Sequence, residues 1–448
     1  MVRVYFQTFG CKANQYDTER MRQEAEARGA VAVSSPADAD LCVVNTCTVT
    51  NQADADARRF IRRLGRKFPG VSTVVAGCSA ALKGHVYREM DGVGEVVEGH
   101  DPVAVARAVV EGGAAPGLRP VPLELRVPLH RMDTEPVGGE LLRTRSGASR
   151  GWLKVQDGCD RRCSFCATRL ARGPSRSRPP EEVVAEAALL ARVHGELVIT
   201  GIHIGHYGRD LDPPWTLSRL AALLLERVPE VRFRVGSVEA TEVDDLLLDL
   251  LECSGGALAP HLHMPLQSGS DAVLRRMRRW HTRDQYRKRA LEVAERVSPL
   301  GLGADIITGF PGERDADHAA TRALVEELPY TYLHVFPYSP REGTAAAALD
   351  DPVPQRIAGE RSRELREMAL EKGRRYRAGR VGGPAAVVLE GDGGTALTED
   401  YLRARVPEAP PPPPAGEAPE GMPRILVGSL QGTEDDLYIA WPHSPSVI

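Results

Sequence analysis

Apolar residues in the first third of the chain form short runs that are separated by longer, more polar segments. The runs over residues 2–6, 41–44 and 72–76 contain valine and have the length of strands. Residues 14–29, which end at a glycine, and residues 52–68, which are rich in arginine and alanine, are predicted to form helices between them. Strands that alternate with helices favour a parallel sheet, so we predict an α/β domain here.

The same alternation returns after residue 150. Each apolar run ends in a loop that carries glycine or polar residues, and amphipathic stretches separate the runs. Six such units predict a curved, incompletely closed (β/α)6 barrel, whose chemistry lies at the carboxyl ends of the strands. The predicted strands cover residues 152–156, 196–200, 231–235, 261–266, 303–308 and 332–336, and the predicted helices include residues 180–193, 216–228, 243–253 and 315–328.

The last part of the chain contains short apolar segments separated by glycine and acidic turns, which predict a small β-barrel. Five successive prolines at 410–414 predict an exposed, semi-rigid loop within it. Its predicted strands cover residues 384–390, 396–406, 425–430 and 437–441. The predicted parts of the chain are an N-terminal domain over 1–118, a linker over 119–149, the α/β barrel over 150–378 and the β-barrel over 379–448.

Composition and charge narrow the possible classes of protein. The chain has 448 residues, 42% of them hydrophobic, and a formal net charge of −4, so it is not an overtly basic nucleic-acid-binding protein. Any contact with nucleic acid must come from local patches. The first residues lack the basic and apolar regions of a signal peptide, and no apolar run is long enough to span a membrane. We expect a soluble, cytoplasmic protein.

Three of the eight cysteines lie in one short loop after the first predicted strand of the α/β barrel. Cys159, Cys163 and Cys166 can turn their sulfurs towards one point, and thiolates are soft ligands that suit zinc, copper(I) and iron–sulfur clusters. The loop holds neither a histidine nor a fourth cysteine, so three sulfurs would leave one metal position open. A zinc site closed by a distant residue and buried cysteines without a metal are the alternatives.

Three further cysteines follow the three predicted strands of the N-terminal domain. Cys11, Cys47 and Cys78 each lie at the carboxyl end of a strand, where the loops of a parallel sheet converge. We therefore predict a second three-thiolate site. Cys42 lies inside its strand and is expected to be a small buried hydrophobic residue. Disulfides are not expected in a long chain without a secretion signal.

The spacing C-x3-C-x2-C resembles the signature of the radical S-adenosylmethionine enzymes. This resemblance implies a [4Fe–4S] cluster on the three cysteines of the loop, with S-adenosylmethionine bound to the remaining iron. Residues 9–14 (FGCKAN), 45–50 (NTCTVT) and 76–78 (AGC) resemble the N-terminal domain of one family of these enzymes, the methylthiotransferases. The second resemblance covers nearly the whole chain and implies an auxiliary [4Fe–4S] cluster on Cys11, Cys47 and Cys78.

The NTCTVT string is most similar to the branch that acts on N6-threonylcarbamoyladenosine next to the tRNA anticodon. The resemblance implies radical removal of hydrogen from C2 of this base, followed by transfer of a methylated sulfur. The implied partners are the tRNA anticodon loop and unidentified electron and sulfur donors. Isopentenyladenosine in tRNA and an aspartate of a ribosomal protein are alternative targets, and a non-enzymatic iron–sulfur electron carrier or sensor is the alternative class.

Four residues at the ends of predicted strands are candidate contacts for S-adenosylmethionine: Gly201, Ser237, Glu239 and Gln267. Glycine allows close approach of a ligand to the backbone, and glutamate or glutamine can bind ribose hydroxyls. Ordinary turns use the same residue types, which is the alternative. No role is assigned to the nearby His203.

Arg172, Arg176 and Arg178 match an arginine string of the family and are the candidate RNA contacts. They lie in residues 143–178, which hold ten lysines or arginines against two acidic residues. A second basic cluster over 275–289 contains Trp280 and Tyr286, and basic residues interleaved with aromatic ones suit RNA. A solvated helix face is the alternative for this second cluster.

The chain departs from the family at residues 167–170 (ATRL), where an apolar pair is usually followed by Pro-Tyr. Substrate fit near the cluster is therefore expected to differ. Residues 397–401 (LTEDY) resemble TRAM, an RNA-binding barrel that ends most members of the family. This part is acidic here and contains few basic residues beyond Arg403, Arg405 and Arg424, which does not favour RNA binding.

Overall fold

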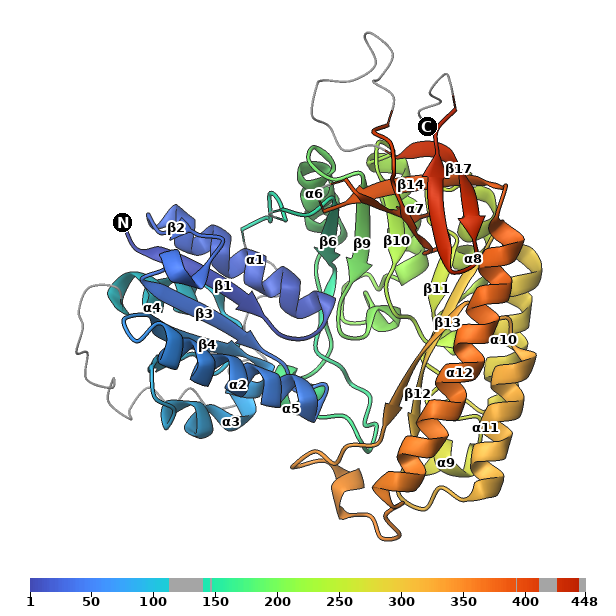
Figure 1. Ribbon diagram of the computed structural model, residues 1–448, viewed down its shortest axis with the longest axis horizontal. Helices are drawn as coiled ribbons and strands as arrows, with labels where there is room; N and C mark the ends of the chain where they lie inside the picture. Colours follow the sequence, from blue (N-terminus) through green and yellow to red (C-terminus); the bar gives the residue numbers. More distant parts are fainter. Residues whose placement is uncertain (113–139, 146, 392, 411–424, 443–448) are drawn as a thin grey trace.

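The computed structural model describes residues 1–112, 140–145, 147–391, 393–410 and 425–442. Residues 119–139 of the predicted linker lie outside the described residues, as do residues 411–414 of the predicted proline loop and Arg424. An N-terminal α/β domain lies on one side of a central α/β barrel domain, and a small β-barrel covers one end of that barrel domain (Figure 1).

The N-terminal domain is built on a five-stranded parallel sheet with the order β2-β1-β3-β4-β5. The three predicted strands are confirmed, whereas the short outer strands β2 and β5 were not predicted. The strands are β1 (Arg3–Thr8), β2 (Val31–Ala32), β3 (Leu41–Thr46), β4 (Ser72–Gly77) and β5 (Val93–Val96), and the helices are α1 (Lys12–Ala27), α2 (Asn51–Lys67), α3 (Cys78–Arg88) and α4 (Pro102–Gly112).

Helices cover both faces of this sheet. Met21 of α1 and Val105 of α4 pack with Val43 of β3 in one buried cluster. Ile61 of α2 and Tyr87 of α3 belong to a second cluster on the other face, together with the adjacent β3 residues Cys42 and Val44. Because successive side chains of a strand point to opposite faces, the sheet is buried on both sides, and Cys42 is a core residue as predicted.

The central domain is the predicted partial α/β barrel. Strands β10-β9-β6 form one parallel sheet and β11-β12-β13 another, and bridges from Phe233 to Leu258 and from Ser237 to His263 join the two sheets. No pairing among the described residues closes the wall between β6 and β13. The strands are β6 (Arg150–Lys154), β9 (Glu196–Thr200), β10 (Arg232–Val235), β11 (His261–His263), β12 (Gly301–Thr308) and β13 (Tyr332–Pro337).

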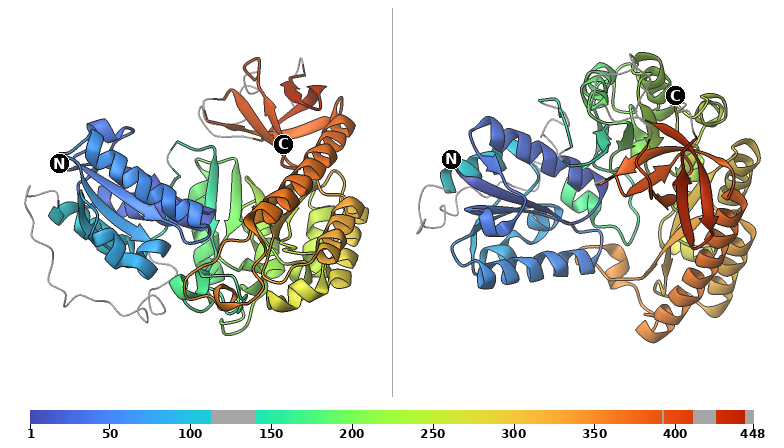
Figure 2. Two further views of the ribbon diagram at one scale, coloured as in Figure 1. Left: turned by 60° about the horizontal axis from the view of Figure 1, so that its bottom comes forward. Right: turned by 45° about the horizontal axis from the view of Figure 1, so that its top comes forward.

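Helices pack against the outside of the barrel wall and share one large apolar core with it. Figure 2 shows the later helices, coloured yellow to orange, on the side of the barrel away from the N-terminal domain. A short antiparallel pair, β7 (Gln156–Asp157) with β8 (Arg176–Ser177), holds the base of the cysteine loop. The helices are α5 (Thr168–Arg172), α6 (Pro180–Ala191), α7 (Leu217–Arg227), α8 (Asp245–Cys253), α9 (Asp271–Arg276), α10 (Arg283–Arg296), α11 (Asp315–Glu327) and α12 (Gln355–Arg380).

The C-terminal part is a closed five-stranded barrel with the order β14-β15-β16-β18-β17. The single strand predicted over 396–406 is wrong, because the chain turns between Thr398 and Arg403. Thr398 accepts a hydrogen bond from the Leu402 amide, and Tyr401 adopts a left-handed conformation with φ 72°. The strands are β14 (Pro384–Glu390), β15 (Thr395–Thr398), β16 (Arg403–Arg405), β17 (Leu426–Thr433) and β18 (Asp436–Ala440).

A buried glutamate connects the C-terminal barrel to the central domain. Glu196 on β9 is ion-paired with Arg232 at 2.7 Å and with Arg234 at 2.8 Å. The same guanidinium groups donate to backbone carbonyls of the C-terminal barrel, Arg232 to Ala386 at 2.7 Å and Arg234 to Thr398 at 3.0 Å. The C-terminal barrel therefore docks on the amino ends of the central strands, away from the cysteine loop.

No helix in the described part of the chain is long and apolar enough to cross a membrane.

Candidate functional site

The three cysteines that follow strands of the N-terminal domain gather around one asparagine. The amide oxygen of Asn14 lies 3.7 Å from the sulfur of Cys11 and 3.8 Å from that of Cys78. Cys47 is close enough to Cys11 for their charges to interact, and its sulfur accepts a hydrogen bond from the Val49 amide at 3.3 Å. The structure thus brings together Cys11, Cys47 and Cys78 from three separate loops.

Cys159, Cys163 and Cys166 lie in the loop between β7 and α5, at the carboxyl end of the barrel. Two of these sulfurs lie close to side chains from other loops. Arg279 donates to the sulfur of Cys163 at 3.5 Å, and Nδ1 of His203 lies 3.6 Å from the sulfur of Cys159. The Cys159 thiol interacts electrostatically with Cys163 and Cys166. The Cys166 amide donates to the Cys163 carbonyl at 3.2 Å, so the chain turns between these two cysteines, and ligation of one cluster by all three stays a prediction.

Sulfur spacing distinguishes between the possible metals. The ligands of one zinc ion, each about 2.3 Å from the metal, must lie within about 4 Å of one another. Three groups of side chains among the described residues have ligand atoms that all lie within 4.8 Å of one another. All three consist of His, Asp or Glu residues, and none contains a cysteine. Neither cysteine set therefore has the close spacing of a zinc site, whereas a cubane cluster binds each cysteine to a different iron and does not require that spacing.

Burial changes the acidity of these thiols. Desolvation raises the pKa of Cys78 and of Cys159 to about 12, and it also raises the pKa of Cys47 and Cys163. A thiol with a raised pKa keeps its proton at neutral pH unless a metal cation replaces that proton. Without a metal, these cysteines are therefore not free thiolate nucleophiles at neutral pH.

Arg172 joins the two cysteine sites through a buried network of charges. Its Nε donates to the sulfur of Cys78 at 3.1 Å, and its terminal nitrogens bind Asp157 at 3.0 Å and Asp17 at 2.7 Å. Lys154 lies 2.6 Å from Asp17 and 2.7 Å from Asp157. Burial alone would raise the pKa of Asp157, but Arg172 and Lys154 hold it well below its usual range.

This geometry corrects the role predicted for two arginines. Arg172 and Arg178 are each 1% exposed, so neither presents its guanidinium to RNA. Arg178 is ion-paired with Glu186 at 2.8 Å and donates to the Lys154 carbonyl. Arg176 on β8 is partly exposed, and its RNA contact stays a prediction. The charge count over residues 143–178 could not reveal burial, because the acidic partner Asp17 lies far away in sequence.

In the second basic cluster, residues 275–289, some side chains are exposed and others are buried. Tyr286 is fully buried on α10 and donates to the Met264 carbonyl at 2.7 Å, so it does not stack on a base. Trp280 is partly buried between two guanidinium groups, with Arg161 3.8 Å and Arg279 4.2 Å from its ring centre. The alternative of a solvated helix face fits most basic residues of this cluster, because Arg275, Arg276 and Arg287 are exposed, whereas Arg279 reaches the cysteine loop.

The four candidate cofactor contacts lie on the same rim as the cysteine loop. Gly201 is the first residue after β9 and is partly exposed, and Ser237 is the second residue after β10 and is exposed. A Cβ at Gly201 would lie 2.7 Å from the Gln156 carbonyl, which explains the glycine sterically. Glu239 is ion-paired with Arg279, which in turn donates to Cys163. Gln267 is 8% exposed and its backbone bridges to β12.

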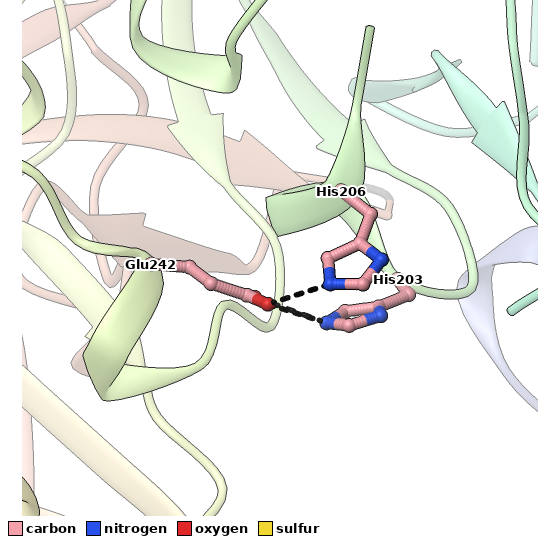
Figure 3. A group of neighbouring side chains, drawn as sticks. All are labelled: His203, His206 and Glu242. Carbon is pink, nitrogen blue, oxygen red and sulfur yellow. Dashed lines mark hydrogen bonds and ion pairs between the residues drawn. The ribbon is translucent and has the colours of Figure 1, made fainter. Parts of the chain in front are cut away.

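Figure 3 shows a group that the sequence did not single out as a unit. Glu242 accepts from His203 at 2.9 Å and lies 3.3 Å from Nε2 of His206, and the two imidazole rings are 4.0 Å apart. Arg161 approaches the same carboxylate at 3.3 Å. Burial would raise the pKa of Glu242, but the bonds from the two histidines lower it below its usual range. The group fixes His203 against Cys159.

The fold and the site define a radical S-adenosylmethionine enzyme with an additional cysteine-bearing domain. Residues 3–99 match the uncharacterized protein family UPF0004, and residues 153–325 match the radical SAM superfamily. A threonylcarbamoyladenosine tRNA methylthiotransferase, MtaB, of Bacillus subtilis is 34% identical over 390 residues, covering 84% of this chain and 82% of the relative. The chain belongs to the radical SAM methylthiotransferase family, whose chemistry uses S-adenosylmethionine and [4Fe–4S] clusters.

Two further comparisons bear on substrate and fold. A tRNA-2-methylthio-N6-dimethylallyladenosine synthase of Sorangium cellulosum is 35% identical over 414 residues, covering 87% of this chain and 82% of the relative. The structure of the radical S-adenosylmethionine methyltransferase TsrM from Kitasatospora setae matches with a TM-score of 0.56 at 17% identity, covering 82% of this chain and 85% of that one. The structural match shows a shared fold only.

Proposed function

We propose that this enzyme adds a methylthio group to C2 of N6-threonylcarbamoyladenosine next to the anticodon of tRNA. The observation that carries the proposal is the similarity to the Bacillus subtilis enzyme over most of both chains. Similar relatives from Thermotoga maritima and Aquifex aeolicus bear the same name. The cysteine geometry supports the same reaction class, because the family's chemistry needs two iron sites that each have an open position.

In this proposal each residue set has a defined task. Cys159, Cys163 and Cys166 hold the cluster at the barrel rim, and Gly201, Ser237, Glu239 and Gln267 surround S-adenosylmethionine there. Cys11, Cys47 and Cys78 hold the auxiliary cluster. When bound, these groups supply radical cleavage and sulfur transfer, while the protein aligns them and excludes water. An electron donor and a sulfur donor complete the reaction, and the enzyme works in the cytoplasm.

The target base must leave the stack of the anticodon loop to reach the space between the two cysteine sets. No acid–base pair is required for hydrogen abstraction, which agrees with the pairing of Glu239 with Arg279 and of Glu242 with Arg161. The protein's task is to position the base, and Arg172 keeps the two cysteine sites in a fixed relation.

A second candidate substrate is isopentenyladenosine, which the Sorangium cellulosum relative favours. The two substrates are separated by anaerobic reconstitution of the full chain and incubation with two anticodon stem-loops, one carrying each modified adenosine. We expect a mass increase for one methylthio group on the threonylcarbamoyl stem-loop and little on the other. The reverse preference would reassign the substrate. Absence of S-adenosylmethionine cleavage by the reduced protein would instead indicate an electron carrier or sensor.

A further inference from the structure

A cavity of about 550 Å³ opens at the seam between the N-terminal domain and the barrel domain. Thr48 and Asn51 line it from the loop after Cys47 and the start of α2. Ala167 and Arg169 line it from the loop after Cys166 and from α5. Its walls thus continue directly from one cysteine of each proposed cluster site, and its volume is typical of a small-molecule or nucleotide site.

Arg341 crosses the seam beside this cavity. It extends from the segment after β13 and donates to the side-chain oxygen of Asn51 and to the carbonyl of Val49. Both acceptors are neutral, so these bonds do not cancel the charge of the guanidinium. Val49 lies two residues after Cys47, and Ala167, which follows Cys166, lines the same cavity as Arg341, so Arg341 lies near a segment of each cysteine site.

Arg169 on α5 adds a second cation to the lining of the cavity. Its side chain is exposed, and within the described ranges no carboxylate forms an ion pair with it. The neighbouring Leu170 is 42% exposed and also lines the cavity.

Counted together, the charged residues that line the cavity are three cations and two carboxylates, a formal excess of one positive charge. Lys83 lines it together with two carboxylates, Asp54 and Glu342. Asp54 is already bound by Arg58 at 2.5 Å and accepts hydrogen bonds from Ser79 and Tyr87, and Lys83 lies 3.6 Å from it. An anion entering the cavity therefore meets the guanidinium groups of Arg169 and Arg341, next to an apolar wall.

We infer that this cavity binds the RNA nucleotide adjacent to the target adenosine, with its phosphodiester on Arg169. A guanidinium binds phosphate oxygens through paired hydrogen bonds, and unstacked bases pack on apolar surface. The inference rests on the proposed function. If the target adenosine is held between the two cysteine sites, the RNA strand on either side of it must run along the seam between the two domains. The inference adds to that function a specific contact site for the RNA backbone, at Arg169.

Fluorescence anisotropy with a labelled anticodon stem-loop, measured on the reconstituted full chain over a series of salt concentrations, tests this contact. We expect Arg169→Gln to weaken binding about tenfold at low salt. The slope of log K against log salt should fall in magnitude by about 0.7, the value for one phosphate of a single strand. Arg169→Lys should keep the wild-type slope, because it keeps the charge.

Arg62→Gln on α2 is the matched control, since Arg62 is also exposed but does not line the cavity. It should leave both the affinity and the slope at the wild-type values. An Arg169→Gln protein that binds more weakly with an unchanged slope would overturn the inference, because a purely structural effect does not change the number of phosphate contacts. A wild-type protein that does not bind the stem-loop even at low salt would overturn the proposed function itself.

Discussion

Arg172 donates its Nε–H to the sulfur of Cys78 across 3.1 Å, although the two residues belong to different domains. Arg172 ends the short helix α5, which follows the loop of Cys159, Cys163 and Cys166, whereas Cys78 begins α3 of the N-terminal domain. One rigid side chain therefore connects the segment of one cysteine set to a ligand of the other. Its remaining donors are held by Asp157 and Asp17, so it has little freedom to move.

Replacing this arginine should change the auxiliary cluster as well as the stability. Arg172→Gln removes a positive charge that neutralises the buried carboxylates of Asp17 and Asp157. Loss of one partner from such a buried ion pair lowers the free energy of unfolding by about 3–5 kcal/mol. Hydrogen bonds to cluster sulfurs raise the reduction potential, so the potential of the auxiliary cluster should fall. Chemical denaturation measures the first effect, and a redox titration followed by electron paramagnetic resonance measures the second.

Arg143→Gln is the control for this variant, because Arg143 is exposed and pairs with the exposed Glu140. Such surface pairs contribute only about 0–1 kcal/mol. If Arg172→Gln lowered stability but left the potential of the auxiliary cluster unchanged, Arg172 would be a structural residue without influence on the cluster.

The two cysteine sets should be separable by iron analysis. Cys163→Ala is expected to lose about half of the iron and all S-adenosylmethionine cleavage. Cys47→Ala should also lose about half of the iron, but it should still cleave S-adenosylmethionine and form no methylthio product. Cys42→Ala removes a buried sulfur that lies inside β3 and should keep both activities. Methylthio product from Cys47→Ala would contradict the assignment of the auxiliary site.

Gly10 controls the approach of two cysteine-bearing loops. A Cβ at this position would lie 2.6 Å from both the Cβ and the sulfur of Cys47, and the residue has φ +115°. Gly10→Ala should therefore displace Cys47 and reduce the iron bound by the N-terminal domain. Gly29→Ala is the matched control: Gly29 has φ +88° but no atom within 4 Å, so we expect a loss of about 1 kcal/mol in stability without loss of iron.

The sequence contains most of the information about strands and ligands but little about burial. The cysteines could be predicted because strand ends in a parallel sheet converge on one edge, and β1, β3 and β4 carry strong apolar runs. Strand β5 (Val93–Val96) was missed because a glycine and a glutamate interrupt its apolar residues. The family's arginine string and the local excess of basic residues predicted an RNA contact at Arg172, whereas its partners Asp17 and Asp157 come together only in the fold.

The contact between His203 and Glu242 could not be predicted from the sequence either. Its position after β9 was noted, but the partner Glu242 lies 39 residues later and follows a different strand. Neither residue has a local pattern that distinguishes it from an ordinary polar turn residue. Only the curvature of the barrel brings both loops to the rim beside Cys159, so this support for the cysteine loop could not be derived from spacing.

The last prediction concerns Glu196, which is buried among Arg234, Arg232 and Arg150. Burial alone would raise its pKa, but the guanidinium groups lower it to about 2 from the ordinary value of 4.5. The unfolded chain therefore takes up the proton first as the pH falls, so the stability that this carboxylate contributes is present above pH 4.5 and is lost between about pH 4.5 and 2.

Glu196→Gln should cost about 3–5 kcal/mol at pH 7 and loosen the docking of the C-terminal barrel, since Arg232 and Arg234 also hold that barrel. Denaturation of the wild type and the variant from pH 7 to pH 3 checks this, and a difference between the two proteins that grows as the pH falls would contradict it.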